Sequence, residues 1–594
     1  MADDDPPARP SSSQGAAAEG APAAGDAPAA GGDPADEQAA DVATHTAESE
    51  EKAPESSAST VATGIFSSKI TGLVREGTFS HFFGVGAHAD VLQTAFRIPN
   101  LLQNLLGEGT LSAAFIPIYS RMIEEGRERE AGRFAGAIFG ILLAVTSGFA
   151  LVGMLLAPYF VALLAPGFAQ NATGELPFLI GELSQFMSQQ FGAQAETANV
   201  ERFRLAVQAV QVIFPMTAVL VLSAWALGVL NSHRRFFVPY VAPVLWNIAI
   251  IGTLFGAAFY VTEAPTAFDD APPSTVTRLL FAACFGALGG GFLQFLMQLP
   301  LVARVMKGFR FSLSSKVEGV REAIYAAGPV IAGRGVYQIS AFVDMQLASI
   351  AAAGALASLR YAQTLYLLPI SLFGLSVAAS ELPELSRLKS QDAGPFLRRV
   401  NRSMRQMMLM IVPTMIGYLA LGFLVVGAFY QRGQFSLNDT WLVYFVLGGY
   451  TVGIAATAVS RLLQNSFYAL SDTKTPALIA VLRIVVSVAV AVPVMFWLDQ
   501  YTVQQVVMEV ATLLYFLRKA LGRLGLPWLR TFQMIGLALL ALVPAGGAWW
   551  LLQGAAWSIY LRGALVVGVF GFSYLGLAWL LSFEELQAWV GDYL

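Results

Sequence analysis

The chain is poor in the residues that build catalytic and metal centres. It contains one cysteine, Cys284, and four scattered histidines among 594 residues. A single cysteine excludes an internal disulfide and a metal site made of several cysteines. The sequence also lacks a GxxxxGK[ST] phosphate-binding loop, which argues against an ATP-driven pump contained in this chain. We therefore expect no cofactor, no metal site and no enzyme activity.

Charged residues are also scarce. They make up 13% of the chain, about half the usual fraction of a soluble protein, whereas hydrophobic residues make up 56%. Apolar segments long enough to cross a bilayer recur from about residue 61 onward. This pattern predicts an all-α polytopic membrane protein with about 14 transmembrane helices. The predicted spans are 61–86, 89–120, 134–164, 205–231, 238–262, 277–303, 322–350, 355–385, 405–429, 439–468, 475–498, 502–519, 531–553 and 560–582.

The first 58 residues differ in composition from the rest. They are rich in Ala, Pro, Gly and Ser, and hold 13 acidic residues against Arg9 and Lys52, a net charge of −11. Such a segment cannot bury enough apolar surface to offset its conformational entropy. We expect residues 1–58 to form a disordered acidic tail, either a solubilising extension or a tail that binds a partner.

The connectors between spans differ in charge from one side to the other. Alternate connectors hold 22 Lys and Arg residues, and those on the other side hold about four. The positive-inside rule then predicts that both termini are cytoplasmic. The long connector 166–203 would lie outside, where GELSQFMSQQFGAQ predicts a short surface helix.

Ionisable residues occur within the first two predicted spans, where a charge normally faces a partner or a water-filled cavity. On one continuous helix, Asp90, Arg97, Asn104 and Glu108 would fall in a stripe about 40° wide and about 27 Å long. This pattern predicts one wall of a hydrophilic path.

The segment that carries these charges contains four specific motifs: GLVRE at 72–76, FGVGAHAD at 83–90, AFRIPNLL at 95–102 and GEGTLSAAFIP at 107–117. With these motifs the chain resembles the MurJ/MviN family of lipid II flippases, in the multidrug/oligosaccharidyl-lipid/polysaccharide exporter superfamily. Further matches occur in family order, among them APGF at 165–168, NSHRRFFVPYVAPVLWNI at 231–248, GPVIAG at 328–333 and FYALSDTKTP at 467–476.

The resemblance implies two six-helix lobes in a V, at 59–303 and 304–525, and two C-terminal helices in 526–594. It implies that the protein moves an undecaprenyl-pyrophosphate-linked peptidoglycan precursor across the bacterial inner membrane by alternating access. The implied partners are this lipid-linked precursor, membrane lipid and cell-wall synthesis proteins, without nucleic acid.

Carried over by position, the resemblance gives a set of substrate-binding candidates. Arginine suits a pyrophosphate because its planar fork makes paired, charge-assisted hydrogen bonds. Lys69 stands where many family members have arginine. The candidates are Lys69, Arg75, Glu76, Asp90, Arg97 and Glu108.

Two departures remove cavity arginines of the family pattern. The family usually shows an arginine after PNLL, whereas this chain has Gln103 and Asn104; the family pattern YADRL reads YAQTL, with Gln363 and Thr364. Arg360 lies one helical turn before Thr364, so we expect it to replace the lost charge. The alternative is that Arg360 only anchors its helix at the interface.

Three further charges fall inside predicted spans and form a candidate ion or charge-pair site: Arg334, Asp344 and Arg483. Asp344 would pair with Arg483 or bind a coupling cation. Arg334 could instead extend to the inner interface. Aromatic residues near span ends, Trp246 among them, are expected to be interfacial anchors.

The sequence leaves other functions open. A degenerate family member could act as a non-transporting scaffold for envelope assembly, as the lost arginines would allow. A flippase for another polyprenyl-linked saccharide is a further alternative. A cation-coupled drug exporter should instead have an acidic or aromatic cavity.

Overall fold

All the elements that the structure describes are helices, which confirms the predicted all-α polytopic class. The computed structural model describes residues 55–169, 196–261, 272–328, 330–331, 345–346, 348–349, 353–371, 385, 393–470, 472, 475–476, 478–479, 528–553, 557, 559–581, 583 and 585–586. Eight helices within these ranges are long and apolar enough to cross a membrane. Helices suit this setting because they satisfy their backbone hydrogen bonds internally.

A first group of helices packs around α9, whose membrane-spanning part is the most buried of these eight. Helix α9 contacts α3, α6 and α11, and α11 in turn packs along α10. Helix α2 lies along α10. The bounds are α2 Glu55–Phe83, α3 Ala87–Leu106, α4 Glu108–Ala114, α5 Ile116–Glu124, α6 Glu128–Leu155, α7 Ala157–Leu164, η1 Pro166–Phe168, α9 Glu196–Ser232, α10 Phe237–Val261 and α11 Pro273–Val305.

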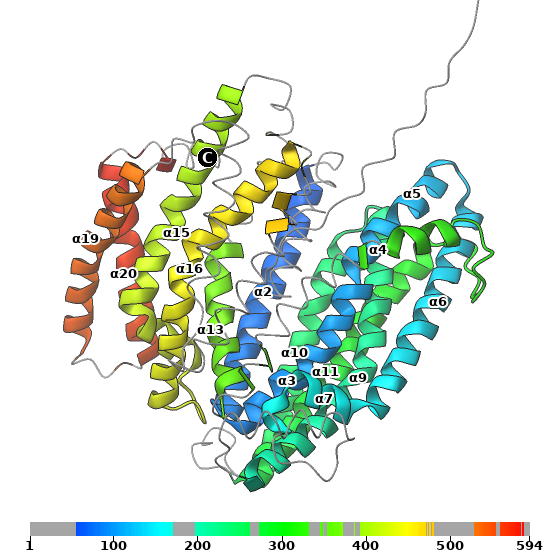
Figure 1. Ribbon diagram of the computed structural model, residues 1–594, viewed down its shortest axis with the longest axis horizontal. Helices are drawn as coiled ribbons and strands as arrows, with labels where there is room; N and C mark the ends of the chain where they lie inside the picture. Colours follow the sequence, from blue (N-terminus) through cyan, green and yellow to red (C-terminus); the bar gives the residue numbers. More distant parts are fainter. Residues whose placement is uncertain are drawn as a thin grey trace, which may run out of the picture.

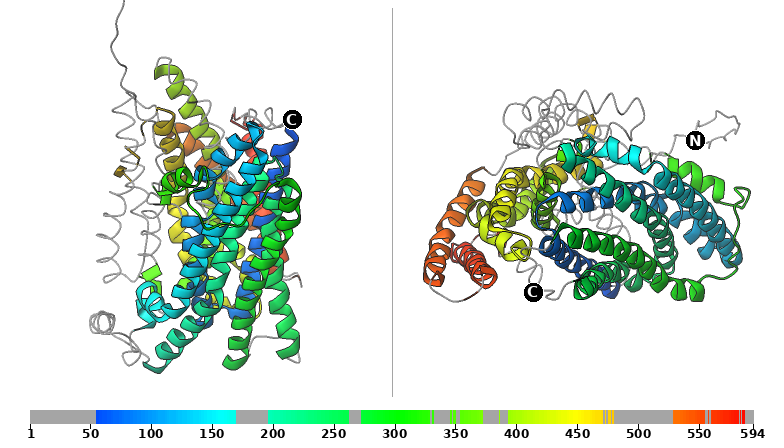
Figure 2. Two further views of the ribbon diagram at one scale, coloured as in Figure 1. Left: turned by 90° about the vertical axis from the view of Figure 1, so that its right-hand side faces the viewer. Right: turned by 90° about the horizontal axis from the view of Figure 1, so that it is seen from below.

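A second group is built on the contact between α15 and α16, with α13 packed against α16. Helices α19 and α20 pair with each other and flank α15 at one edge of the molecule (Figures 1 and 2). The bounds are α13 Ala355–Pro369, α15 Ala393–Tyr430, α16 Leu437–Ala469, α19 Trp528–Leu552 and α20 Ile559–Leu580.

The two ends of the bundle differ in their connectors (Figure 1). One end carries the turns 125–127 and 233–236 and the connector 306–319. We call it the basic end, because these are the connectors that are rich in Lys and Arg. The opposite end carries the short turns 84–86, 353–354 and 431–436. Helix α2 begins at the basic end and α20 finishes there (Figure 1), as an even number of spans requires.

The predicted span 89–120 is wrong in its continuity. Helix α3 ends at Leu106, and the chain continues as α4 and α5. The break lies at Gly107, whose ψ of −136° is not helical. A straight stripe from Asp90 to Glu108 therefore does not form. The span 134–164 is likewise divided, into α6 and α7.

Several sequence predictions fall outside the described residues. These are the tail up to residue 54, the surface helix in 181–194, the span 502–519, and most of the spans 322–350 and 475–498. Helix α2 begins at Glu55, a few residues before the predicted end of the tail.

The connector that follows α11 is held against α6 by its backbone. Three glycines one turn apart, Gly132, Gly136 and Gly140, face the carbonyl oxygens of Lys307, Arg310 and Ser312, and a Cβ at any of them would overlap these oxygens. The contact therefore needs glycine at all three positions. We call residues 307–312 the strap.

The chain beyond the strap also packs on the first group. Val320 and Ala323 are buried in one cluster with Phe115 and Phe134. Ion pairs join Arg121 to Glu322 at 2.9 Å and Arg127 to Glu318 at 2.6 Å. The whole connector up to Ala323 is thus attached to the first group.

Candidate functional site

A cavity of about 400 Å³ lies between the two helix groups. Its walls come from α2, α3, α9, α10 and α11 on one side and from α13 and α16 on the other. On α9, α10 and α11 the lining positions fall in the half of each helix nearest the basic end.

The charged residues in the cavity wall are mainly cationic. Five of the substrate-binding candidates lie there, four of them basic: Lys69, Arg75, Glu76, Arg97 and Arg360. With one acid among them, the formal charge of this set is +3. A cavity of this sign favours an anionic ligand.

Arg75 is fixed by contacts on three sides. Its Nη1 donates to Asn247 Oδ1 at 2.9 Å, and its Nη2 donates to Glu76 Oε1 at 2.7 Å. The guanidinium carbon lies 4.9 Å from the centre of the Trp246 ring, within cation–π range. The side chain is 12% exposed, so its charge is largely removed from water but still reaches the cavity.

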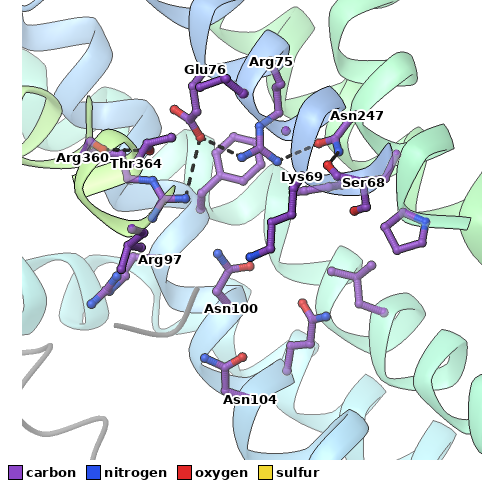
Figure 3. Close-up of a pocket in the computed structure, with 18 of the residues that line it drawn as sticks. Ser68, Lys69, Arg75, Glu76, Arg97, Asn100, Asn104, Asn247, Arg360 and Thr364 are labelled. Atoms are coloured by element: carbon purple, nitrogen blue, oxygen red, sulfur yellow. Dashed lines mark hydrogen bonds and ion pairs between the residues drawn. The ribbon is translucent and has the colours of Figure 1, made fainter. Parts of the chain in front are cut away.

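Glu76 joins the two groups of helices. Its Oε1 accepts from Arg75 on its own helix and lies 3.7 Å from Arg360 Nη2 on α13 (Figure 3). The Glu76 side chain is 3% exposed, and its Oε2 has no hydrogen-bond partner among the described residues. One carboxylate therefore lies between two guanidinium groups from different helix groups.

Arg360 reaches the cavity from the second group. It is 24% exposed, lines the cavity and approaches Glu76. Thr364, one turn later, lines the same cavity and donates from Oγ1 to the Arg360 carbonyl oxygen at 2.9 Å. Arg360 thus faces the cavity, and its role as a replacement for the lost charge stays a prediction.

Asp90 does not line this cavity, which corrects its prediction as a substrate-binding residue of the cavity. Its carboxylate is buried at the opposite end, where Oδ2 lies 2.7 Å from Arg202 Nη2. It also accepts from the backbone N–H groups of Gly354, at 2.6 Å, and Ala357, at 2.9 Å. Asp90 thus caps the beginning of α13 and joins the two groups, as an acid at a helix N-terminus does.

The opposite end is closed by further contacts between the groups. Tyr361 donates from its hydroxyl to the Gly84 carbonyl oxygen at 3.2 Å, and Gln434 N–H donates to the His81 carbonyl oxygen at 2.9 Å. Gly84 and Gly433 both have φ near +55°, a region that favours glycine. A Cβ on either would overlap backbone atoms across this junction.

The remaining candidates are not placed in the cavity. Glu108 begins α4, and its side chain is outside the described part of the structure. Arg334, Asp344 and Arg483 also lie outside the described residues.

Sequence reasoning missed two residues of the site. Trp246 was expected to be an interfacial anchor, but its ring makes a cation–π contact with Arg75. Its Nε1 donates to the Ala287 carbonyl oxygen at 3.0 Å. Asn247 orients the same guanidinium. Both lie in the motif at 231–248, and a polar residue inside an apolar span was the available signal.

Comparisons with known proteins agree with this architecture. A family model described as lipid II flippase MurJ matches residues 79–571. A probable lipid II flippase MurJ from Rhizobium tropici is 31% identical over 437 residues, covering 73% of this chain and 74% of that protein. Lipid II flippase MurJ from Burkholderia cenocepacia is 27% identical over 538 residues, covering 87% and 95%.

Solved structures show the same fold. One described as lipid II flippase MurJ in an inward closed conformation has a TM-score of 0.61 at 22% identity, covering 86% of this chain and 97% of that one. An inward-facing multidrug resistance MATE family transporter has a TM-score of 0.51 at 12% identity, covering 80% and 95%. The family model spans most of this chain, so the resemblance drawn from the motifs is confirmed: the chain belongs to the lipid II flippase MurJ family.

Proposed function

We propose that this protein translocates lipid II, the undecaprenyl-pyrophosphate-linked peptidoglycan precursor, across the bacterial inner membrane by alternating access. The observation that carries the proposal is the cationic cavity, to which both helix groups contribute a guanidinium. A pyrophosphate held by Arg75 and Arg360 would contact both groups at once. Its binding would then favour conformations in which the groups approach each other.

We infer the state of the transporter from the position of the cavity. The lining positions of α9, α10 and α11 lie toward the basic end, and the opposite end is closed by the contacts of Asp90, Tyr361 and Gln434. We assign the basic end to the cytoplasm by the positive-inside rule. This orientation supports the proposal that the cavity receives substrate from the cytoplasmic side.

Glu76 gives the cavity an internal counter-ion. In the empty cavity it partly neutralises Arg75 and Arg360, which lowers the cost of burying two like charges. An entering pyrophosphate would compete with Glu76 for the same donors. Release of the pyrophosphate on the far side is then assisted, because the Glu76 carboxylate can pair with the guanidinium groups of Arg75 and Arg360 again.

A flippase for another polyprenyl-linked saccharide is the alternative, and the comparisons do not favour it. Gln103, Asn104, Gln363 and Thr364, where this chain departs from the family pattern, nevertheless all line the cavity. Complementation of a strain depleted of its own lipid II flippase separates the two. Growth without lysis supports lipid II, and failure by a chain that inserts normally argues for another saccharide.

The membrane orientation can be tested by cysteine labelling in a Cys284→Ala background. Ser314 is exposed in the connector at the basic end, and Asn438 is exposed near the turn at the opposite end. We expect a membrane-impermeant maleimide to label Asn438→Cys in intact cells and Ser314→Cys only after permeabilisation. The reverse pattern would overturn the assignment of the cytoplasmic side.

Arg360→Thr should weaken binding of undecaprenyl pyrophosphate to the purified protein about tenfold or more. A charge-assisted hydrogen bond contributes about 1.5–3 kcal/mol, and each 1.4 kcal/mol changes the affinity tenfold. Adding Thr364→Arg should recover most of the affinity, because it restores the family arrangement. Arg432→Thr is the matched control, since Arg432 is an arginine of the second group outside the cavity. Unchanged affinity in Arg360→Thr would show that Arg360 only anchors its helix.

A further inference from the structure

One wall of the cavity is polar but uncharged. It is formed by α3, α9 and α11 of the first group, beside the cationic residues. We call this set the amide wall; it comprises Asn100, Gln103, Asn104, Ser223, Gln294 and Gln298. Figure 3 shows the Lys69 side chain pointing toward Asn100, so the amide wall begins where the cationic side of the cavity ends.

Hydrogen bonds within the wall fix the orientation of Gln298. Its Nε2 donates to Ser223 Oγ at 2.6 Å and to the Gln294 carbonyl oxygen at 3.2 Å. A backbone carbonyl can only accept, so the amide nitrogen has to face it and the amide oxygen has to face away. Gln294 Nε2 also donates to Ser223 Oγ, at 3.1 Å, which holds the serine between the two glutamines.

This arrangement leaves an acceptor without a donor. Gln298 is 1% exposed, yet its Oε1 has no hydrogen-bond partner among the described residues. Buried polar atoms are nearly always satisfied, and leaving one unsatisfied costs free energy. Gln298 also lines the cavity, so a ligand in the cavity can provide the missing donor.

We propose that the amide wall is a saccharide subsite, which binds hydroxyl and acetamido groups of the ligand while its anionic linkage lies against Arg75 and Arg360. The proposal rests on the proposed function and names the part of the substrate that each side of the cavity recognises.

The composition of the wall fits an uncharged saccharide better than an anionic group. Amides and hydroxyls provide both donors and acceptors, as sugar hydroxyls do, and an acetamido N–H can donate to Gln298 Oε1. Carboxylates and phosphates lack donors and would leave this oxygen unsatisfied. A site built to hydrogen-bond a substrate group discriminates strongly against an analogue without it, so the wall would select for the head group.

The test compares two probes on the purified full-length chain in nanodiscs. Undecaprenyl pyrophosphate carries the tail and the anionic linkage, and lipid II adds the N-acetylated saccharide head. We expect Gln298→Leu to weaken lipid II binding about tenfold and to leave undecaprenyl pyrophosphate binding unchanged. Ser223→Ala should lower lipid II affinity less, in the same direction, because it removes the group that holds the Gln298 amide.

Two controls locate the effect. Gln211→Leu makes the same substitution at an exposed glutamine of α9 outside the cavity, and should change neither affinity. Arg75→Ala should weaken both probes, since both carry the pyrophosphate. Thermal unfolding and size-exclusion profiles report whether each variant folds. If Gln298→Leu does not fold, the result for Ser223→Ala alone decides whether the saccharide subsite exists.

The outcomes separate the subsite from the proposed function. Equal loss for both probes, or no loss in a folded variant, overturns the saccharide subsite. Wild-type protein that binds both probes equally tightly also overturns it, while leaving binding of the lipid pyrophosphate in place. Wild-type protein that binds neither probe better than phosphatidylglycerol overturns the proposed function and the subsite together.

Discussion

Arg75→Ala should abolish complementation of a flippase-depleted strain, with normal amounts of protein in the membrane. The wild-type side chain is 12% exposed, and its guanidinium is held by Asn247, Glu76 and the Trp246 ring. A pre-positioned charge of this kind binds an anion without a large cost in side-chain entropy. Its loss removes charge-assisted hydrogen bonds to the pyrophosphate, so we expect transport to fall at least 100-fold.

The controls for Arg75 separate charge from geometry. Arg75→Lys keeps the charge but loses the planar fork, and should retain only part of the activity. Arg121→Ala removes an arginine whose ion pair with Glu322 is more than half exposed, and should complement fully. Full complementation by Arg75→Ala would show that the pyrophosphate is held elsewhere.

Asp90→Asn should cause a large loss of stability rather than a selective loss of substrate binding. Arg202 is 8% exposed and lies against Asp90 on one side and the Phe168 ring on the other. Without the carboxylate, a buried guanidinium loses its counter-ion, at a cost of about 3–5 kcal/mol. The capping of α13 is weakened as well. Thermal unfolding of the purified protein measures the effect.

A double variant tests whether the pair itself is responsible. Asp90→Asn leaves the buried guanidinium of Arg202 without a counter-ion. Adding Arg202→Met removes this unpaired charge and should recover much of the lost stability. Glu322→Gln breaks an exposed pair and should change the unfolding free energy by less than about 1 kcal/mol. An Asp90→Asn protein with unchanged melting and weakened lipid II binding would instead place Asp90 in the substrate site.

The helices were predictable because apolar runs of sufficient length mark them directly. The break at Gly107 was not, because the helical periodicity continues through it and only backbone geometry separates α3 from α4. The partner of Asp90 was equally hidden. Arg202 is 112 residues away from Asp90 in the sequence. It falls in the predicted external connector 166–203, where an arginine is expected to be exposed to water.

The cationic side of the cavity was more accessible to sequence reasoning than the amide wall. Charges within apolar spans are rare, so Arg75, Arg97 and Arg360 stood out as candidates. Glutamines and asparagines at helical spacing give no such signal, because the same residues satisfy each other in many helix contacts. Only the hydrogen-bond directions around Gln298 show that one acceptor is left over.

The strap determines where the two helix groups can move relative to each other. The connector after α11 is not a slack tether, because the glycines of α6 hold residues 307–312, and Val320 and Ala323 are buried in the first group. Those residues therefore travel with the first group as one body. A change in the angle between the groups would therefore have to be accommodated by the chain after Ala323, because the connector up to that residue is already held by the first group.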